Sequence, residues 1–178
     1  MKFLQILLSI IVVLAIIIIG GSFFLPKSYT VNRTITILAP DSVIYKNIAD
    51  YNEFYKWNAW SKMDPQAKIT ITGIAAQPGH LYQWNGEKNG TGQMLINKVE
   101  ANKMVDMELK FIKPMESTAD TRFDIEKAGN GNKVTWTMSG ESKGIINKWF
   151  GLFMDKMIGK DFEDGLKSLK EKSEKGVN

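Results

Sequence analysis

The chain has 178 residues, a single histidine, no cysteine and a net charge of +4. These counts exclude a disulfide framework and a cysteine nucleophile, and they leave few residue types that could ligate a metal. The lysines are scattered and form no clustered basic stripe, so we expect no nucleic-acid partner.

The first segment is almost purely apolar. Residues 3–25 carry no charge and one amide, Gln5. About 20 such residues cross a bilayer, so residues 1–26 are predicted to form a membrane anchor. A cleaved signal peptide is the alternative, with 20–22 as a small-residue cleavage site, but its apolar core is usually only about 7–15 residues long. We expect a retained single-pass anchor that places the following domain outside the cytoplasm.

The segment after Pro26 predicts a mostly β domain. Apolar and polar residues alternate in short β-branched runs, which is typical of strands with one covered face. Asn-Gly pairs at 89–90 and 130–131 are typical of hairpin turns, and a third pair at 85–86 closes a predicted strand. Consecutive strands with short turns favour an antiparallel sheet. The predicted strands are residues 31–38, 68–74, 80–84, 92–99, 104–112, 117–126 and 133–139.

Helical spacing occurs in three places. A short amphipathic helix with Val43, Ile44 and Ile48 follows the first strand, and a second short helix lies around 51–57. Residues 145–170 are predicted to form one long helix. The expected fold is therefore α+β, with a sheet of about six or seven strands curved around the C-terminal helix, and residues 173–178 as a solvated tail.

Several local sequences resemble one family. LPKSYTVNRTITILAP, FYKWNAWSKMDP and GLFMDKMIGKDFEDGLKSLK are similar to segments of the SRPBCC or START-like superfamily, particularly its membrane-anchored bacterial members. Such proteins are commonly labelled polyketide cyclase/dehydrase or lipid-transport-like. The resemblance implies a helix-grip domain over residues 27–172 with a cavity between the sheet and the long helix.

Strand parity and the stripe of the long helix predict which side chains would bound such a cavity. A mixture of aromatic, methionine and aliphatic residues suits an adaptable apolar pocket, although the same residues could also fill a solid core. The predicted ligand-binding residues are Trp84, Met107, Leu109, Phe123, Trp136, Phe153 and Met157. Trp57 and Trp60 are predicted to cover the mouth as a gate, with packing of the short helices on the sheet as the alternative.

The pattern of polar residues does not predict a catalytic site. Asp120 and Asp124 alternate with Phe123 and should face solvent, and Asp64, before a proline, should set a turn. His80 is expected at the surface or rim, without a metal or cofactor. We expect a binding domain for a small hydrophobic or amphipathic ligand, with membrane lipid as one candidate. The alternatives are an enzyme of the polyketide cyclase/dehydratase type and a partner-binding module with a filled core.

Overall fold

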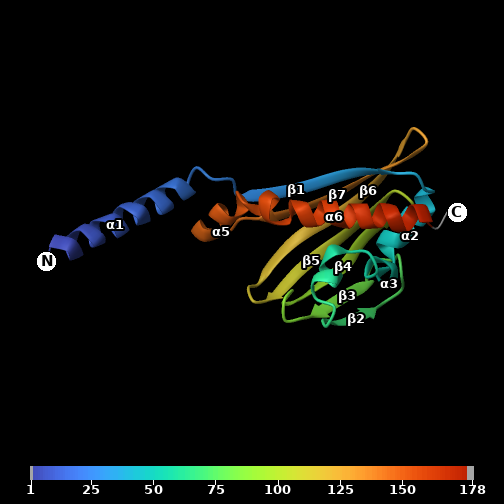
Figure 1. Cartoon of the computed structure of the whole chain (residues 1–178), viewed down its shortest axis with the longest axis horizontal. Coiled ribbons are helices and arrows are strands. Elements are labelled where there is room, and N and C mark those ends of the chain that lie inside the picture. Colours follow the sequence, from blue (N-terminus) through green and yellow to red (C-terminus); the bar gives the residue numbers. More distant parts are fainter. Residues whose placement is uncertain (1, 176–178) are drawn as a thin grey trace.

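The computed structural model describes residues 2–175, which form a long N-terminal helix followed by one α+β domain (Figure 1). Seven strands make a single antiparallel sheet in the order β1-β7-β6-β5-β4-β3-β2. The strands from β2 to β7 follow one another as a meander, and β1 joins at the β7 edge. Their bounds are β1 Ser28–Ile37, β2 Lys68–Thr72, β3 Leu81–Asn85, β4 Thr91–Glu100, β5 Met104–Lys113, β6 Ser117–Ala128 and β7 Gly131–Glu141.

The predicted antiparallel sheet is therefore confirmed, with strand ends shifted by a few residues. Buried and exposed positions alternate along β6, where Ala119, Thr121 and Phe123 are buried and Asp120 is exposed. This alternation gives the sheet one apolar face, which curves around the C-terminal helix α6 (Met154–Lys175) (Figure 1). The helix contributes Phe162, Leu166 and Leu169 to the core at helical spacing.

Three short helices connect β1 to β2. They are α2 (Asp41–Ala49), α3 (Tyr51–Phe54) and α4 (Ala59–Met63). Ile44 and Ile48 of α2 are fully buried, so this helix closes one end of the core. The last of the three was not predicted.

The long helix predicted over residues 145–170 is two helices, α5 (Gly144–Gly151) and α6. The interruption follows Gly151, a residue type that weakens helices, and the Phe153 amide donates to the Phe150 carbonyl at 2.9 Å in an i→i+3 turn. At the other end α6 continues into the expected tail. Ser173 is buried and accepts a hydrogen bond of 3.0 Å from Asn47 Nδ2, while residues 176–178 lie outside the described part.

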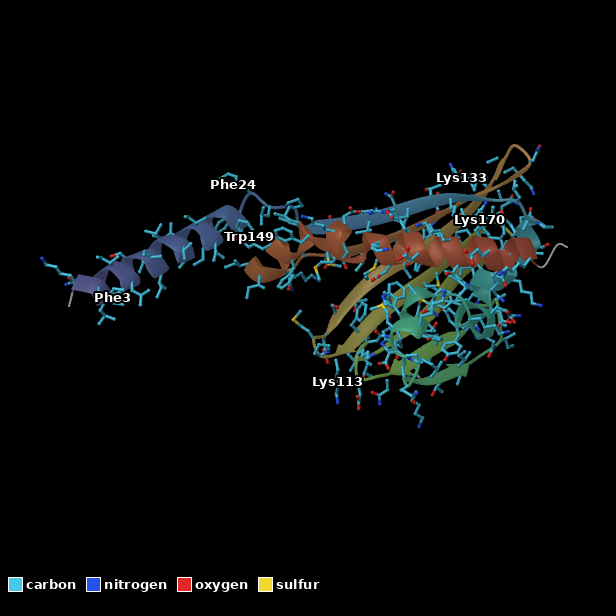
Figure 2. The ribbon with its side chains drawn as sticks, in the orientation of Figure 1. Phe3, Phe24, Lys113, Lys133, Trp149 and Lys170 are labelled. Carbon is cyan, nitrogen blue, oxygen red and sulfur yellow. The ribbon has the colours of Figure 1, made fainter. Side chains whose placement is uncertain are left out.

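Helix α1 (Lys2–Ser22) stands away from the domain and has the length and composition of a membrane-crossing helix or a signal sequence. Its last turns contact α5. Trp149 Nε1 donates to the Ile18 carbonyl at 3.1 Å, and Lys148 Nζ donates to the Ser22 carbonyl at 2.9 Å. The side-chain view shows Trp149 beside this end of α1 (Figure 2).

Candidate functional site

A cavity of about 310 Å³ lies between the curved sheet, α4 and α6. Its walls are mostly aromatic, methionine and aliphatic side chains that arrive from strands β2 to β7 and from three helices. The apolar wall is made by Phe54, Trp60, Met63, Ala67, Ile69, Tyr82, Trp84, Met94, Leu109, Phe111, Trp136, Met138, Ile158 and Phe162. A few polar residues, Asn58, Ser61, Asp64, Asn89 and Thr121, also line it.

Trp136 is the centre of the aromatic wall. Its indole lies stacked between Phe123, at a centroid distance of 4.6 Å, and Phe162, at 4.0 Å. Its Nε1 donates to Thr121 Oγ1 at 2.9 Å, and that hydroxyl in turn donates to the Thr137 carbonyl at 3.2 Å. Because the indole N–H is satisfied within the protein, Trp136 offers the cavity an apolar ring with a fixed orientation.

Helix α4 covers the cavity and is fastened to the β3–β4 turn. Asn58 Oδ1 accepts the Ser61 amide at 2.9 Å and caps the helix start. Asp64 Oδ2 accepts the Lys88 amide at 2.9 Å, and Asn89 Nδ2 donates to the Trp60 carbonyl at 2.7 Å. Trp60 is thereby held edge-on to Trp136, at a centroid distance of 5.6 Å. These polar contacts hold α4, which carries Trp60, over the cavity. They are needed because a helix of five residues has little stability of its own.

The cavity has little ionisable chemistry. Among its described lining residues Asp64 is the one carboxylate, and its Oδ2 is occupied by backbone amides. The Tyr82 hydroxyl is neutral at neutral pH and can donate a hydrogen bond, and burial raises its pKa further. Within residues 2–175 no group of three or more His, Asp or Glu side chains could hold a metal ion. The arrangement suits an apolar molecule with one polar end.

The structure places the predicted cavity residues in three groups. Trp84, Leu109 and Trp136 line the cavity. Met107 and Phe123 are fully buried beside it in the core but do not line it.

Phe153 and Met157 do not face the cavity but are exposed on the outer side of the helices. The prediction that they point into the cavity is wrong, because they lie on a different face of the helices from the residues that line it. Neighbouring residues in a helix point about 100° apart, and α6 turns Ile158 and Phe162 inward instead. The helix is interrupted at residues 152–153. The sequence pattern of a single continuous helix therefore could not predict how α6 is rotated about its axis.

The two tryptophans proposed as a gate have different positions. Trp60 lines the cavity from α4, but Trp57 is buried below it and donates from Nε1 to the Asn47 carbonyl at 2.7 Å. Trp57 therefore packs the short helices onto the core, which was the alternative reading.

Other cavity residues escaped the sequence analysis. Tyr82 has the same strand parity as Trp84, and Met94 is its register partner on β4, so these two could have been found from the pattern once the pairing was known. Ile158 and Phe162 could not be assigned to the cavity without knowing how α6 is rotated about its axis.

His80 was expected at the surface or rim and is instead buried. Its ring stacks on Tyr51 at a centroid distance of 4.6 Å, and Nε2 accepts the Tyr51 amide at 3.1 Å. Nδ1 lies 2.9 Å from the Thr72 carbonyl, so the neutral Nδ1–H tautomer satisfies both contacts. The histidine joins α3 to the sheet edge, a role that its sequence neighbours do not indicate.

Solved structures share this architecture at low sequence identity. The Aha1 dimer protein from Colwellia psychrerythraea is 23% identical with a TM-score of 0.58, covering 84% of this chain and 98% of that one. An uncharacterised protein from Rhizobium leguminosarum is 14% identical with a TM-score of 0.61, covering 83% and 95%. The di-domain aromatase/cyclase StfQ of steffimycin biosynthesis is 7% identical with a TM-score of 0.61, covering 84% and 52%.

These likenesses concern the fold alone, and comparison with curated protein sequences gives no match. The sequence itself matches the family model described as polyketide cyclase/dehydrase and lipid transport over residues 28–174. That span begins with β1 and includes all but the last described residue of α6. With its seven-stranded sheet closed on a C-terminal helix, the chain belongs to the polyketide cyclase/dehydrase and lipid transport family of the SRPBCC superfamily.

Proposed function

We propose that this protein is a membrane-tethered binding domain that holds a small apolar or amphipathic molecule in the cavity beneath α4. The observation that carries the proposal is the cavity itself. Its volume of about 310 Å³ is at the lower end of the range for ligand sites, and its walls are aromatic and aliphatic with few polar groups. The apolar body would lie against Trp60, Trp84 and Trp136, with a polar end near Asn58 and Tyr82.

Leu109 offers a direct test, because it lines the cavity from the middle of β5. Leu109→Trp should fill the space, and Lys110→Trp adds the same ring to the opposite, exposed side of the strand. We expect native mass spectrometry of the full chain, released from detergent micelles, to detect a bound small molecule in the parent and in Lys110→Trp. The Leu109→Trp protein should lose it. Equal retention in both variants would contradict binding in this cavity.

The tether is proposed from α1, whose 21 residues carry no acidic side chain and, between Phe3 and Ser22, no charge. We propose that this helix is uncleaved, with the amino terminus in the cytoplasm and the domain outside. Because the chain has no cysteine, Lys133→Cys creates a unique surface thiol. A membrane-impermeant maleimide should label it in intact cells. Labelling that needs cell lysis would place the domain on the cytoplasmic side.

An enzyme of the cyclase or dehydratase type is the second candidate, and one observation favours it. Asp64 lines the cavity, where a carboxylate could exchange protons with a bound substrate. Against this role, its Oδ2 accepts two backbone amides, from Lys88 at 2.9 Å and Asn89 at 3.4 Å, which suits a structural residue. We therefore favour binding over catalysis, and Asp64→Asn separates the two.

A further inference from the structure

An apolar stripe on the outer side of α5 and the start of α6 is left uncovered by the domain. Ile146 is 67% exposed, Phe150 49%, Phe153 53% and Met157 56%. These residues are spaced by four, three and four positions, which places them on one helix face. The interruption between the helices does not break the stripe. Across it, Leu152 keeps a helical conformation and the Phe153 amide donates to the Phe150 carbonyl at 2.9 Å, and the Met157 amide then donates to the Phe153 carbonyl at 2.9 Å.

Other residues of these helices make protein contacts. Met154 packs against the core and Ile158 lines the cavity. Trp149 lies against α1, close enough to Gly21 that a Cβ there would be 2.8 Å from the indole. The stripe and the neighbouring Ile145 and Leu152 thus remain exposed among the described residues, and large apolar side chains exposed to water are costly.

The contact with α1 fixes where this segment sits. A helix of 21 residues is about 31 Å long, which matches the hydrocarbon thickness of about 30 Å. Trp149 bonds to the carbonyl of Ile18, one turn before α1 ends at Ser22. If α1 spans the bilayer, α5 lies at the depth of the headgroups, where tryptophan side chains are favoured.

We infer that the stripe Ile146–Phe150–Phe153–Met157 rests on the membrane surface beside the anchor and brings one end of the cavity against lipid, so that the ligand enters from the bilayer. This inference rests on the tether proposed above. Lys156 is exposed beside Met157 and suits anionic headgroups, whereas Lys148 is engaged with the Ser22 carbonyl. An amphipathic helix with an apolar face and a flanking lysine is typical of interfacial binding.

The cavity adjoins this surface. Ile158, which lines the cavity, directly follows Met157 of the stripe. On the sheet side Phe111 lines the cavity, and the chain then continues to the exposed Ile112 near the end of β5 and to the exposed Met115 in the β5–β6 turn. Figure 1 shows α5 and the β5–β6 turn at the end of the domain nearest α1. Lipid at this end would meet apolar side chains on both walls.

Single cysteines test the contact without background, because the natural chain has none. Phe150→Cys and Phe153→Cys are labelled with an environment-sensitive fluorophore, and the full chain is reconstituted in phosphatidylcholine–phosphatidylglycerol vesicles that contain spin-labelled lipid. Ile11→Cys, in the middle of α1, reports insertion of the anchor. Lys133→Cys lies at the opposite end of the domain (Figure 2). We expect quenching and a blue shift at positions 11, 150 and 153, and neither at 133.

If the label at position 11 is quenched but the labels at 150 and 153 are as exposed to water as the label at 133, the inference is overturned and the proposed tether still stands. No quenching at 11 would remove the tether, and the inference would fall with it. A second measurement follows entry of the ligand. Replacing both Phe150 and Phe153 by serine should slow transfer of a fluorescent fatty acid from vesicles to the cavity several-fold, with the same final occupancy. An unchanged transfer rate would overturn entry from the bilayer.

Discussion

Trp136 of β7 and Phe162 of α6 lie face to face, with ring centroids 4.0 Å apart and planes inclined by 12°. Both rings line the cavity, and both are almost completely buried. The contact that fastens the helix to the sheet is therefore also part of the cavity wall. If the cavity holds the proposed ligand, a change in either ring should alter both stability and binding.

Phe162→Ala should lower the free energy of unfolding by about 3–5 kcal/mol, because it removes a buried ring and leaves a space beside the existing cavity. Denaturant unfolding of the full chain in detergent, followed by circular dichroism, measures this loss. Phe150→Ala removes the same side chain from an exposed position and should change the free energy by less than about 0.5 kcal/mol. Similar losses in the two variants would contradict the assigned packing.

His80→Ala should destabilise the protein without touching the cavity wall. It leaves the Tyr51 amide without its 3.1 Å acceptor and removes the ring stacked on Tyr51. An unpaired buried amide costs about 1–3 kcal/mol, and loss of the ring adds to that. Thermal unfolding should show a lower Tm, while the bound small molecule persists below the transition. An unchanged Tm would argue against the buried, doubly bonded histidine.

Glu53 predicts how stability changes with acid. Hydrogen bonds from Lys172 and then Lys56 lower the pKa of Glu53 from 4.5 to about 2. The folded state thus favours the charged form, and this contribution is full above pH 4.5 and disappears as the pH falls towards 2.

Glu53→Gln should therefore be less stable than the parent at pH 7, and the difference should shrink between about pH 4.5 and pH 2. Urea unfolding at a series of pH values measures it. Lys172→Met removes the stronger partner, which joins α6 to α3 over 2.7 Å, and should reproduce most of the effect. A difference that is independent of pH would contradict the ion pair.

Asp64→Asn separates binding from catalysis. The asparagine side chain keeps an oxygen that can accept the Lys88 amide, so α4 should stay fastened to the β3–β4 turn. We expect the bound molecule to be retained and its mass to be unchanged. If the parent converts the molecule and the variant accumulates it unconverted, Asp64 is a proton-transfer group and the enzyme reading is correct.

Much of the architecture follows from local pattern. The alternation along β6, with Ala119, Thr121 and Phe123 inward and Asp120 outward, predicts one covered sheet face, because successive strand residues point to opposite sides. The same parity placed Trp84, Leu109 and Trp136 on the face that carries the cavity. The charge-free stretch within α1 could also be recognised from the sequence, because the length of an apolar segment does not depend on tertiary contacts.

The tertiary structure alone decided the features that depend on contact between two elements. The rotation of α6 puts Ile158 and Phe162 in the cavity and leaves Phe153 and Met157 outside, and it is set by packing against the sheet after the interruption that follows Gly151. His80 is buried because Tyr51, 29 residues away, supplies its partner. Sequence periodicity defines the faces of each element, but which face is covered depends on what the rest of the chain brings against it.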